Sequence, residues 1–143
     1  MSLEDYQRNG WIQKFEMSSE EVGHLLEVAD RDISQSQVPG LGAEWRFDIA
    51  YNAALQLAVA VLGHAGFRAE RVNKHQRSIE CLAFTLRLPR KDLDFLDRCR
   101  RKRYIAVYER VGAVSDGEAA ELVAFAMELR KKTHEFLKRI REP

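Results

Sequence analysis

The chain contains few of the residues that interrupt helices or cross-link small folds. It has three prolines, eight glycines and two cysteines in 143 residues. Two cysteines are too few for the disulfide framework of a small secreted domain, and a chain of this length can bury a core without one. Cys81 and Cys99 lie among apolar residues of predicted helices, so we expect buried free thiols rather than a disulfide.

A long hydrophobic run is also missing. The longest apolar stretch, residues 49–62, is interrupted by Asn52 and Gln56 and is shorter than the about 20 residues that a membrane-spanning helix needs. The first residues include Glu4 and Asp5 and show no apolar core of a secretory signal. We therefore expect a cytoplasmic protein that does not contact a membrane.

The sequence lacks the short motifs of the familiar enzyme classes. Its four histidines and two cysteines show no close metal-ligand spacing. Gly40-Leu41-Gly42 precedes a predicted helix but follows no strand, unlike a dinucleotide-binding loop. No serine-nucleophile signature is present either. We expect no metal and no cofactor, and classical hydrolases, kinases and dehydrogenases are excluded.

Apolar residues recur instead with the period of an α-helix. Capping boxes at residues 18–21 and 115–118 mark two helix starts, and Pro39, Gly63 and Pro89 mark breaks between helices. The helices predicted in this way span residues 19–35, 43–65, 74–88, 92–111 and 116–141. No strand pattern competes with them. The sequence predicts an all-α, up-and-down bundle of about five helices.

The predicted bundle occupies residues 19–143, and residues 1–18 form a lead-in. Trp11, Ile12 and Phe15 give the lead-in apolar side chains that we expect to pack on the body. The helix predicted at 43–65 is apolar nearly all round in its middle, which is typical of a central helix. Asn52 and Gln56, one turn apart inside it, are expected to hydrogen-bond to neighbouring helices and fix their register.

Charge is distributed unevenly along the chain although the formal net charge is only +1. Residues 1–48 carry four Lys or Arg against ten Asp or Glu, whereas residues 87–143 carry fifteen against ten. The two halves can neutralise each other within one subunit or across a dimer, or they can leave a basic surface for a polyanion.

The basic excess is concentrated in one short segment. Five of the six residues at positions 98–103 are basic, and two tyrosines follow. Such a segment is either a solvated helix face or a ridge that binds RNA or another anion, because arginines match phosphates and tyrosines offer stacking faces. The candidate anion-binding residues are Arg98, Arg100, Arg101, Lys102, Arg103, Tyr104 and Tyr108.

Several segments, taken in order, resemble the HEPN superfamily of small prokaryotic helical domains. Residues 46–54 followed by 62–68 resemble the long second helix of that family and its glycine stop. Residues 75–79 are similar to the histidine-led start of its next helix, and residues 103–108 occupy the place of its Arg-x4–6-His signature. The resemblance covers about residues 19–140.

The resemblance implies a dimer and assigns roles to individual residues. In ribonuclease members, the arginine and histidine of the signature meet their counterparts across a dimer interface and cleave RNA without metal. Arg103 would match the arginine, with Arg101 as the alternative, and Tyr108 would stand where the histidine belongs. Because tyrosine has a pKa of about 10 against about 6.5 for histidine, this departure disfavours catalysis at neutral pH.

Three hypotheses follow for function. The first is a non-catalytic or divergent HEPN-like homodimer that binds RNA, a nucleotide or a protein partner, in a toxin–antitoxin system or beside a minimal nucleotidyltransferase. The second is a metal-independent endoribonuclease that uses Arg103 with Tyr108, or with His75 or His64 recruited from another helix. The third is a structural interaction bundle in which Arg101 and Arg103 pair with acidic residues of the N-terminal half, namely Asp30, Asp32 or Asp48.

Overall fold

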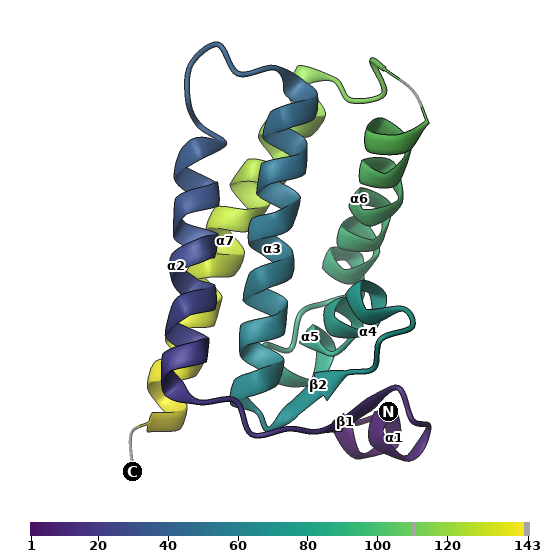
Figure 1. Ribbon diagram of the computed structural model, residues 1–143, viewed down its shortest axis with the longest axis vertical. Helices are drawn as coiled ribbons and strands as arrows, with labels where there is room; N and C mark the ends of the chain where they lie inside the picture. Colours follow the sequence, from purple (N-terminus) through teal and green to yellow (C-terminus); the bar gives the residue numbers. More distant parts are fainter. Residues whose placement is uncertain (110, 142–143) are drawn as a thin grey trace.

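The computed structural model describes residues 1–109 and 111–141, with the side chains of residues 139–141 left aside, and confirms the all-α bundle (Figure 1). No helix in these residues is long and apolar enough to cross a membrane. The elements in chain order are α1 (Leu3–Arg8), β1 (Ile12–Lys14), α2 (Ser19–Gln35), α3 (Ala43–His64), β2 (Phe67–Ala69), α4 (Lys74–Glu80), α5 (Leu82–Thr85), α6 (Arg90–Tyr108) and α7 (Asp116–Arg141).

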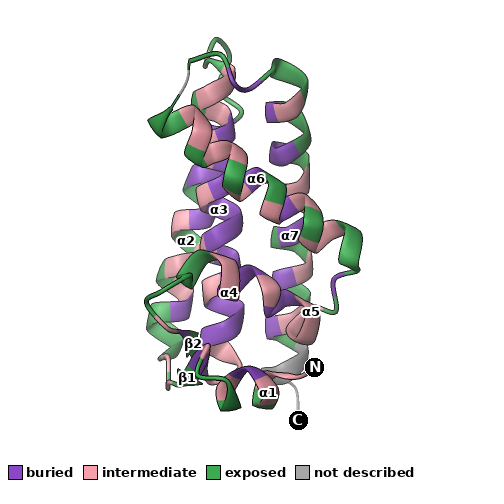
Figure 2. Ribbon diagram, turned by 90° about the vertical axis from the view of Figure 1, so that its right-hand side faces the viewer, coloured by how far each residue is buried: buried purple, intermediate pink, exposed green. Residues whose placement is uncertain are grey.

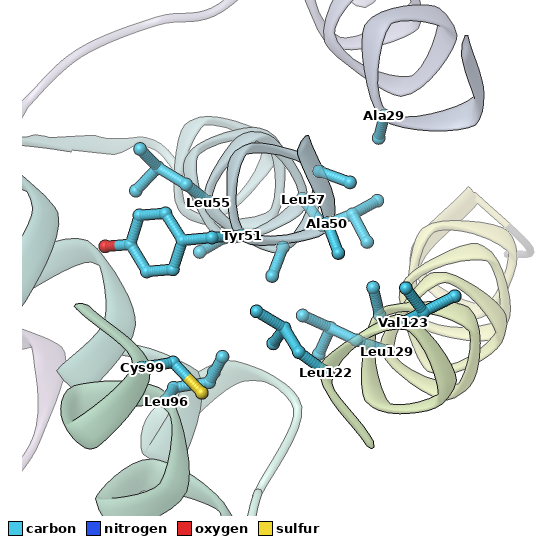
Figure 3. Close-up of a cluster of buried hydrophobic side chains, with 14 of the residues drawn as sticks. Ala29, Ala50, Tyr51, Leu55, Leu57, Leu96, Cys99, Leu122, Val123 and Leu129 are labelled. Atoms are coloured by element: carbon cyan, nitrogen blue, oxygen red, sulfur yellow. The ribbon is translucent and has the colours of Figure 1, made fainter. Parts of the chain in front are cut away.

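Helix α3 forms the centre of the molecule. Figure 1 shows α2 and α7 running alongside α3, with α6 on its other side and the short elements at one end of the bundle. Buried residues occur on every side of α3, as its all-round apolar sequence predicts, and Figure 2 shows this helix mostly buried. Its Tyr51 and Leu57 pack in one core with Leu96 of α6 and Leu122 and Leu129 of α7 (Figure 3).

Polar residues on α3 join it to α2. Asn52 Nδ2 donates a hydrogen bond to Asp32 Oδ2 at 2.6 Å, and Gln56 Nε2 donates to Asn52 Oδ1 at 3.2 Å. The expected role of Asn52 in fixing helix register is therefore confirmed, whereas the hydrogen bond of Gln56 stays within its own helix. Asp32 is 5% exposed, so this contact lies in a largely water-excluded place where an unmade hydrogen bond is costly.

The predicted helix ends hold for some elements and are wrong for others. The two predicted capping boxes begin α2 and α7, and α6 runs from Arg90 to Tyr108 rather than from 92 to 111, with residue 110 outside the described residues. The single helix predicted at 74–88 is wrong. It divides into α4 and α5 at Cys81 and has ended by Arg87, which has a left-handed φ of 57°. This turn lets the Leu88 amide donate to the Leu82 carbonyl oxygen at 3.3 Å and buries the Leu88 side chain.

A two-stranded antiparallel ribbon, which the sequence did not predict, ties the N-terminal residues to the bundle. β1 pairs with β2 in the register Ile12↔Ala69 and Lys14↔Phe67. Ile12 is 2% exposed, and Trp11 packs beside it against a small second core, as expected of the lead-in. The buried members of that core are Tyr6, Ile12, Leu62, Phe67, Ala69 and Cys81.

Gly63, near the end of α3, allows the chain to cross the helix closely. A Cβ atom placed there would lie 2.4 Å from the Met17 sulfur and 3.1 Å from the Met17 Cβ. The first distance is too short for real atoms and the second is tighter than ordinary van der Waals contact, so the Met17 side chain would have to shift. Glycine at this position therefore lets the segment between β1 and α2 rest directly on the backbone of α3.

Both cysteines are buried and free, as the sequence predicts. Burial raises the pKa of each thiol, Cys81 and Cys99, to about 12. Both thiols therefore stay protonated at neutral pH, and they serve as small apolar core residues.

Candidate functional site

The basic segment of α6 lies on a half-exposed face, and most of its cations have carboxylate partners. Asp97, on the preceding turn, forms ion pairs with Arg100 at 3.0 Å and with Arg101 at 3.2 Å. Lys102 pairs with Glu118 of α7, and Arg103 Nε lies 2.5 Å from Asp48 Oδ1 of α3. Arg98 lies near the ring of Phe95, with 6.0 Å between its guanidinium carbon and the ring centroid.

These ion pairs match the third hypothesis, in which acidic residues of the N-terminal half neutralise the basic helix, at one position only. Asp48 belongs to the acidic N-terminal half and pairs with Arg103, as that hypothesis expects. Arg101 pairs within its own helix instead. Asp30 and Asp32, the other expected partners, form ion pairs with Arg130 and Arg31. Four of the five cations at positions 98–103 therefore share three carboxylates, and among the described residues the segment keeps a positive surplus.

Arg103 also lies against a buried tyrosine. Its guanidinium carbon is 5.5 Å from the centroid of the Tyr51 ring, and that ring is 6.4 Å from the ring of His75, near the start of α4. Arg100, one turn before Arg103, is close enough to influence the ionisation of both rings. We refer to Tyr51, His75, Arg100 and Arg103 as the Arg–Tyr–His cluster. Three helices contribute to it.

The hydroxyl of Tyr51 is the unusual group in the cluster. The residue is 1% exposed, and its hydroxyl oxygen is buried without a hydrogen-bond partner among the described residues. Figure 3 shows this hydroxyl directed away from α7. A buried polar atom without a partner costs about 1–3 kcal/mol, so it calls for an explanation.

The ionisation states of the cluster suit hydrogen-bond donation. Burial raises the pKa of Tyr51 to about 12, although the charges of Arg100 and Arg103 oppose that rise. The pKa of His75 is lowered by burial first, then by the positive charges of Arg103, Lys74 and Arg100. At neutral pH the cluster thus presents a phenol, two guanidinium groups and a largely neutral imidazole.

The two tyrosines that follow the basic segment lie outside this cluster. Tyr104 is 56% and Tyr108 68% exposed, and their ring centroids are 5.0 Å apart. No hydrogen bond or ring contact among the described residues joins Tyr108 to Arg103. The structure therefore does not bring together the pair that the HEPN resemblance assigns to the signature.

Of the two histidines considered as substitutes, His75 is in the cluster and His64 is not. His64 ends α3 and makes an edge-on contact with Phe136 of α7, at 6.1 Å between ring centroids. It lies 13 residues after Tyr51 on the same helix, a distance of about 20 Å at the usual rise per residue.

A small pocket opens between α3 and α6 beside the cluster. It has a volume of about 270 Å³, and its walls include Trp45, Asp48, Arg103 and Val107. Trp45 is 65% exposed and Val107 46%, so apolar surface surrounds this end of the basic segment. Such exposed aromatic and apolar side chains are typical of contact surfaces.

Sequence reasoning missed Tyr51 and Trp45 as site residues. Tyr51 is one of several large side chains in an apolar helix, and only its position under Arg103 makes it a candidate. Trp45 carried a usable signal, because a tryptophan in the first turn of a predicted helix is uncommon on a surface without a role.

Among the described residues, no three His, Cys, Asp or Glu side chains are grouped closely enough to hold a metal ion. No protein-family model, curated protein or solved structure matches this chain.

Proposed function

We propose that the chain is a cytoplasmic, HEPN-like helical module that binds the phosphate backbone of RNA through the Arg–Tyr–His cluster and the face of α6. The observation that carries the proposal is the buried, unpartnered hydroxyl of Tyr51 beside Arg100 and Arg103. A phosphate oxygen would accept from the guanidinium groups, and it would accept from the phenol as well only after the side chains that cover the Tyr51 hydroxyl move aside. Charge-assisted hydrogen bonds of this kind are among the strongest that proteins make.

RNA is favoured over a single nucleotide because the basic segment continues beyond the cluster. Arg98 and Arg101 are exposed along α6, and the neighbouring rings of Tyr104 and Tyr108 follow within two turns. Exposed aromatic faces beside a row of cations suit single-stranded nucleic acid, since bases stack on the rings while phosphates meet the cations. A mononucleotide would occupy only part of this surface.

The decisive variant is Tyr51→Phe, which removes the hydroxyl and leaves the ring. If the hydroxyl donates to a phosphate, the variant should bind a short single-stranded RNA several-fold more weakly. Its melting temperature should be equal or higher, because the buried unpartnered oxygen is gone. The matched control is Tyr6→Phe. The Tyr6 hydroxyl donates to Glu80 at 3.0 Å, so this variant should lose stability and bind RNA normally.

Fluorescence anisotropy with a labelled 12-nucleotide RNA, across a salt series, measures both affinity and charge. In Arg100→Ala/Arg103→Ala the slope of log affinity against log salt should become shallower by about 1.4, since each contact with a single strand contributes about 0.7. Equal affinity and equal slope in wild type and the double variant would sink the proposal.

A metal-independent ribonuclease is the second candidate, and the state of His75 favours it. An imidazole that is largely neutral at pH 7 can accept the proton of a ribose 2′-hydroxyl as that oxygen attacks the phosphorus, while the bond from phosphorus to the 5′-oxygen of the next nucleotide breaks and that oxygen takes a proton from water. Arg103 would stabilise the charge that develops on the phosphate. We prefer His75 to Tyr108 as the proton acceptor of this hypothesis, because the His75 ring lies beside Tyr51, which contacts Arg103.

Cleavage of RNA in EDTA tests the second candidate. Activity should disappear in His75→Ala and persist in Tyr108→Phe. Loss of activity in Tyr108→Phe with retention in His75→Ala would restore the original assignment. RNA that is bound and left intact by the wild type would leave binding as the function and reject cleavage of that RNA.

The structural interpretation keeps support from the Asp48–Arg103 pair. If Arg103 acts only in packing α6 on α3, Arg103→Ala should lower the melting temperature and leave RNA affinity unchanged after correction for unfolded protein. If Arg103 binds RNA, Arg103→Ala should lower the RNA affinity more than the melting temperature. Melting curves and anisotropy on the same preparation therefore separate the two roles.

A further inference from the structure

A second pocket lies beside the β1–β2 ribbon and the C-terminal half of α3, and Lys74, the neighbour of His75 in the chain, is among the residues that line it. It has a volume of about 520 Å³, within the range of about 300–1,000 Å³ that small-molecule sites in proteins occupy. The ribbon, the C-terminal half of α3 and the helix α4 all contribute to its walls. We refer to it as the ribbon pocket.

The inner wall of the ribbon pocket is apolar. Leu62 and Phe67 are buried there, and Phe15 and Val59 are half-buried at its sides. Such a surface gains free energy when it covers an apolar ligand, by roughly 25 cal/mol for each Å² removed from water. A purely polar ligand such as a free sugar or inorganic ion would leave this wall unused.

One polar group interrupts the apolar wall. Ser78 is 1% exposed and lines the pocket. Its hydroxyl makes no hydrogen bond with the described residues, although serine inside a helix commonly bonds to the carbonyl one turn earlier. A buried hydroxyl on a pocket wall can donate to, or accept from, a ligand atom.

The rim of the ribbon pocket is positively charged, and its cations, unlike most of those in the basic segment of α6, have no carboxylate partner among the described residues. Arg68, Arg71 and Lys74 line the pocket and form no ion pair with a carboxylate of the described residues. Arg68 lies over the Phe15 ring at 4.7 Å, which holds its guanidinium at the pocket edge. Glu21 also lines the pocket and offsets one of the three charges.

We propose that the ribbon pocket binds a small organic anion that combines an apolar body with one anionic head group. The body would lie against Phe67, Leu62 and Val59, and the head would meet Arg71 and Lys74. Carboxylate and phosphate heads share the chemistry that these side chains recognise, since both accept charge-assisted hydrogen bonds from Arg and Lys. The pocket residues differ from those of the Arg–Tyr–His cluster, although the charge of Lys74 acts on His75 as well.

Isothermal titration of the full chain with three ten-carbon probes tests the proposal. The probes are decanoate, decyl phosphate and decanol, each kept below its aggregation concentration. Decanoate or decyl phosphate should bind at least about 10-fold more tightly than decanol, because one charge-assisted contact contributes about that factor. The stronger of the two anions identifies the preferred head group.

The charge variant is Arg71→Ala/Lys74→Ala, in which both residues are exposed and their replacement should not disturb folding. It should bind the anionic probe at least about 10-fold more weakly and decanol unchanged. The matched control is Lys131→Ala/Lys138→Ala, which removes two exposed cations from α7 and should bind like wild type. A filling variant, Val59→Trp, should abolish binding of all three probes if circular dichroism shows that it folds.

Several results would overturn the proposal. They are no binding of any probe by the wild type, equal binding of decanol and both anions, or equal affinity of the wild type and the Arg71→Ala/Lys74→Ala variant for the anion. Loss of anion binding in the α7 control as large as in the charge variant would assign it to general surface charge instead.

Discussion

His75 carries a positive charge less readily than an ordinary histidine, because burial and three neighbouring cations oppose protonation. Its pKa in the folded protein therefore lies below its usual value of 6.5. As pH falls below about 6.5, the unfolded chain takes up this proton before the folded chain does, so stability falls. Bound phosphate would reverse the effect, since an anion favours the charged imidazole.

The pH dependence of stability tests this assignment. Between pH 7.5 and pH 5.5 the melting temperature of the wild type should fall, and His75→Gln should show a smaller fall. Thermal melts in matched buffers measure the difference. His75 is itself exposed on one side, and His24→Gln, which replaces another exposed histidine on α2, controls for the loss of a histidine in general. The same fall in His75→Gln as in the wild type would contradict the assignment.

Gly63 and Gly23 offer a matched pair of glycine substitutions within helices. Gly63→Ala should lower the free energy of unfolding by about 1–3 kcal/mol, because its methyl group would overlap Met17. Gly23→Ala meets no atom within 4 Å, so it should raise stability by up to about 1 kcal/mol through helix propensity. Chemical denaturation measures both changes. Equal effects in the two variants would contradict the close crossing at Gly63.

At the scale of elements, the start of α7 is coupled to α6 through one side chain. The Glu118 carboxylate accepts a hydrogen bond from the Ser115 amide at 3.0 Å, and the Ser115 hydroxyl accepts one from the Glu118 amide at 3.1 Å. The Glu118 carboxylate also forms an ion pair with Lys102. The hydrogen bond from Lys102, followed by those from Ser115, lowers the pKa of Glu118. Glu118 thus both closes the capping box at the start of α7 and holds Lys102 of the basic segment.

Glu118→Gln should separate these two roles, since glutamine can still close a capping box. We expect a loss of at most about 1 kcal/mol from the half-exposed ion pair, and a further loss of about 1 kcal/mol in Glu118→Ala from the cap. The ion-pair part is present above the usual pKa of Glu118 and disappears as pH falls through its lowered value. Denaturant melts at pH 7 and at pH 3 check both parts.

How far the sequence predicts an element depends on whether its signal is local. Ser18 and Ser115 announce helix starts within four residues, and both starts are confirmed. The strands have three residues each, too few to show alternation, and their pairing depends on chain 55 residues away. The break at Cys81 and the left-handed turn at Arg87 both fall on residues other than glycine and proline, so no local signal marks them.

The candidate site follows the same rule. The basic segment is contiguous, so the sequence displays Arg100 and Arg103 directly. Tyr51 and His75 come from other helices, and their approach to Arg103 is a product of tertiary packing. Tyr108, to which the resemblance assigns the place of the histidine, lies on the exposed side of the helix, and its assignment stays a prediction.

At the scale of the whole molecule, one end of the bundle exposes apolar side chains from α3 and α6. Trp45, Tyr104, Val107 and Tyr108 are all 46% exposed or more. Tryptophan and tyrosine are enriched among residues that dominate protein–protein contacts. If the proposed HEPN-like dimer forms, this end of the bundle is the surface on which we expect it, and its aromatic rings would then be less free to stack on RNA bases.

Sedimentation velocity tests the dimer. The wild type should sediment as a dimer at micromolar concentration, and Trp45→Ala/Tyr108→Ala should shift it to the monomer without changing the melting temperature of the monomer fold. Lys131→Ala/Lys138→Ala, on the surface of α7, should stay dimeric. A monomeric wild type would leave the exposed aromatic rings to RNA stacking alone.

The ion pair between Asp48 and Arg103 gives the protein an internal competitor for any ligand of Arg103. A small monovalent anion offers one charge and meets a carboxylate already held beside the guanidinium at high effective concentration. A polyanion brings several charges together, so only a multivalent ligand gains enough to displace Asp48. Asp48→Asn should therefore let small anions bind at Arg103. The affinity of the protein for inorganic phosphate should then lie closer to its affinity for RNA than in the wild type.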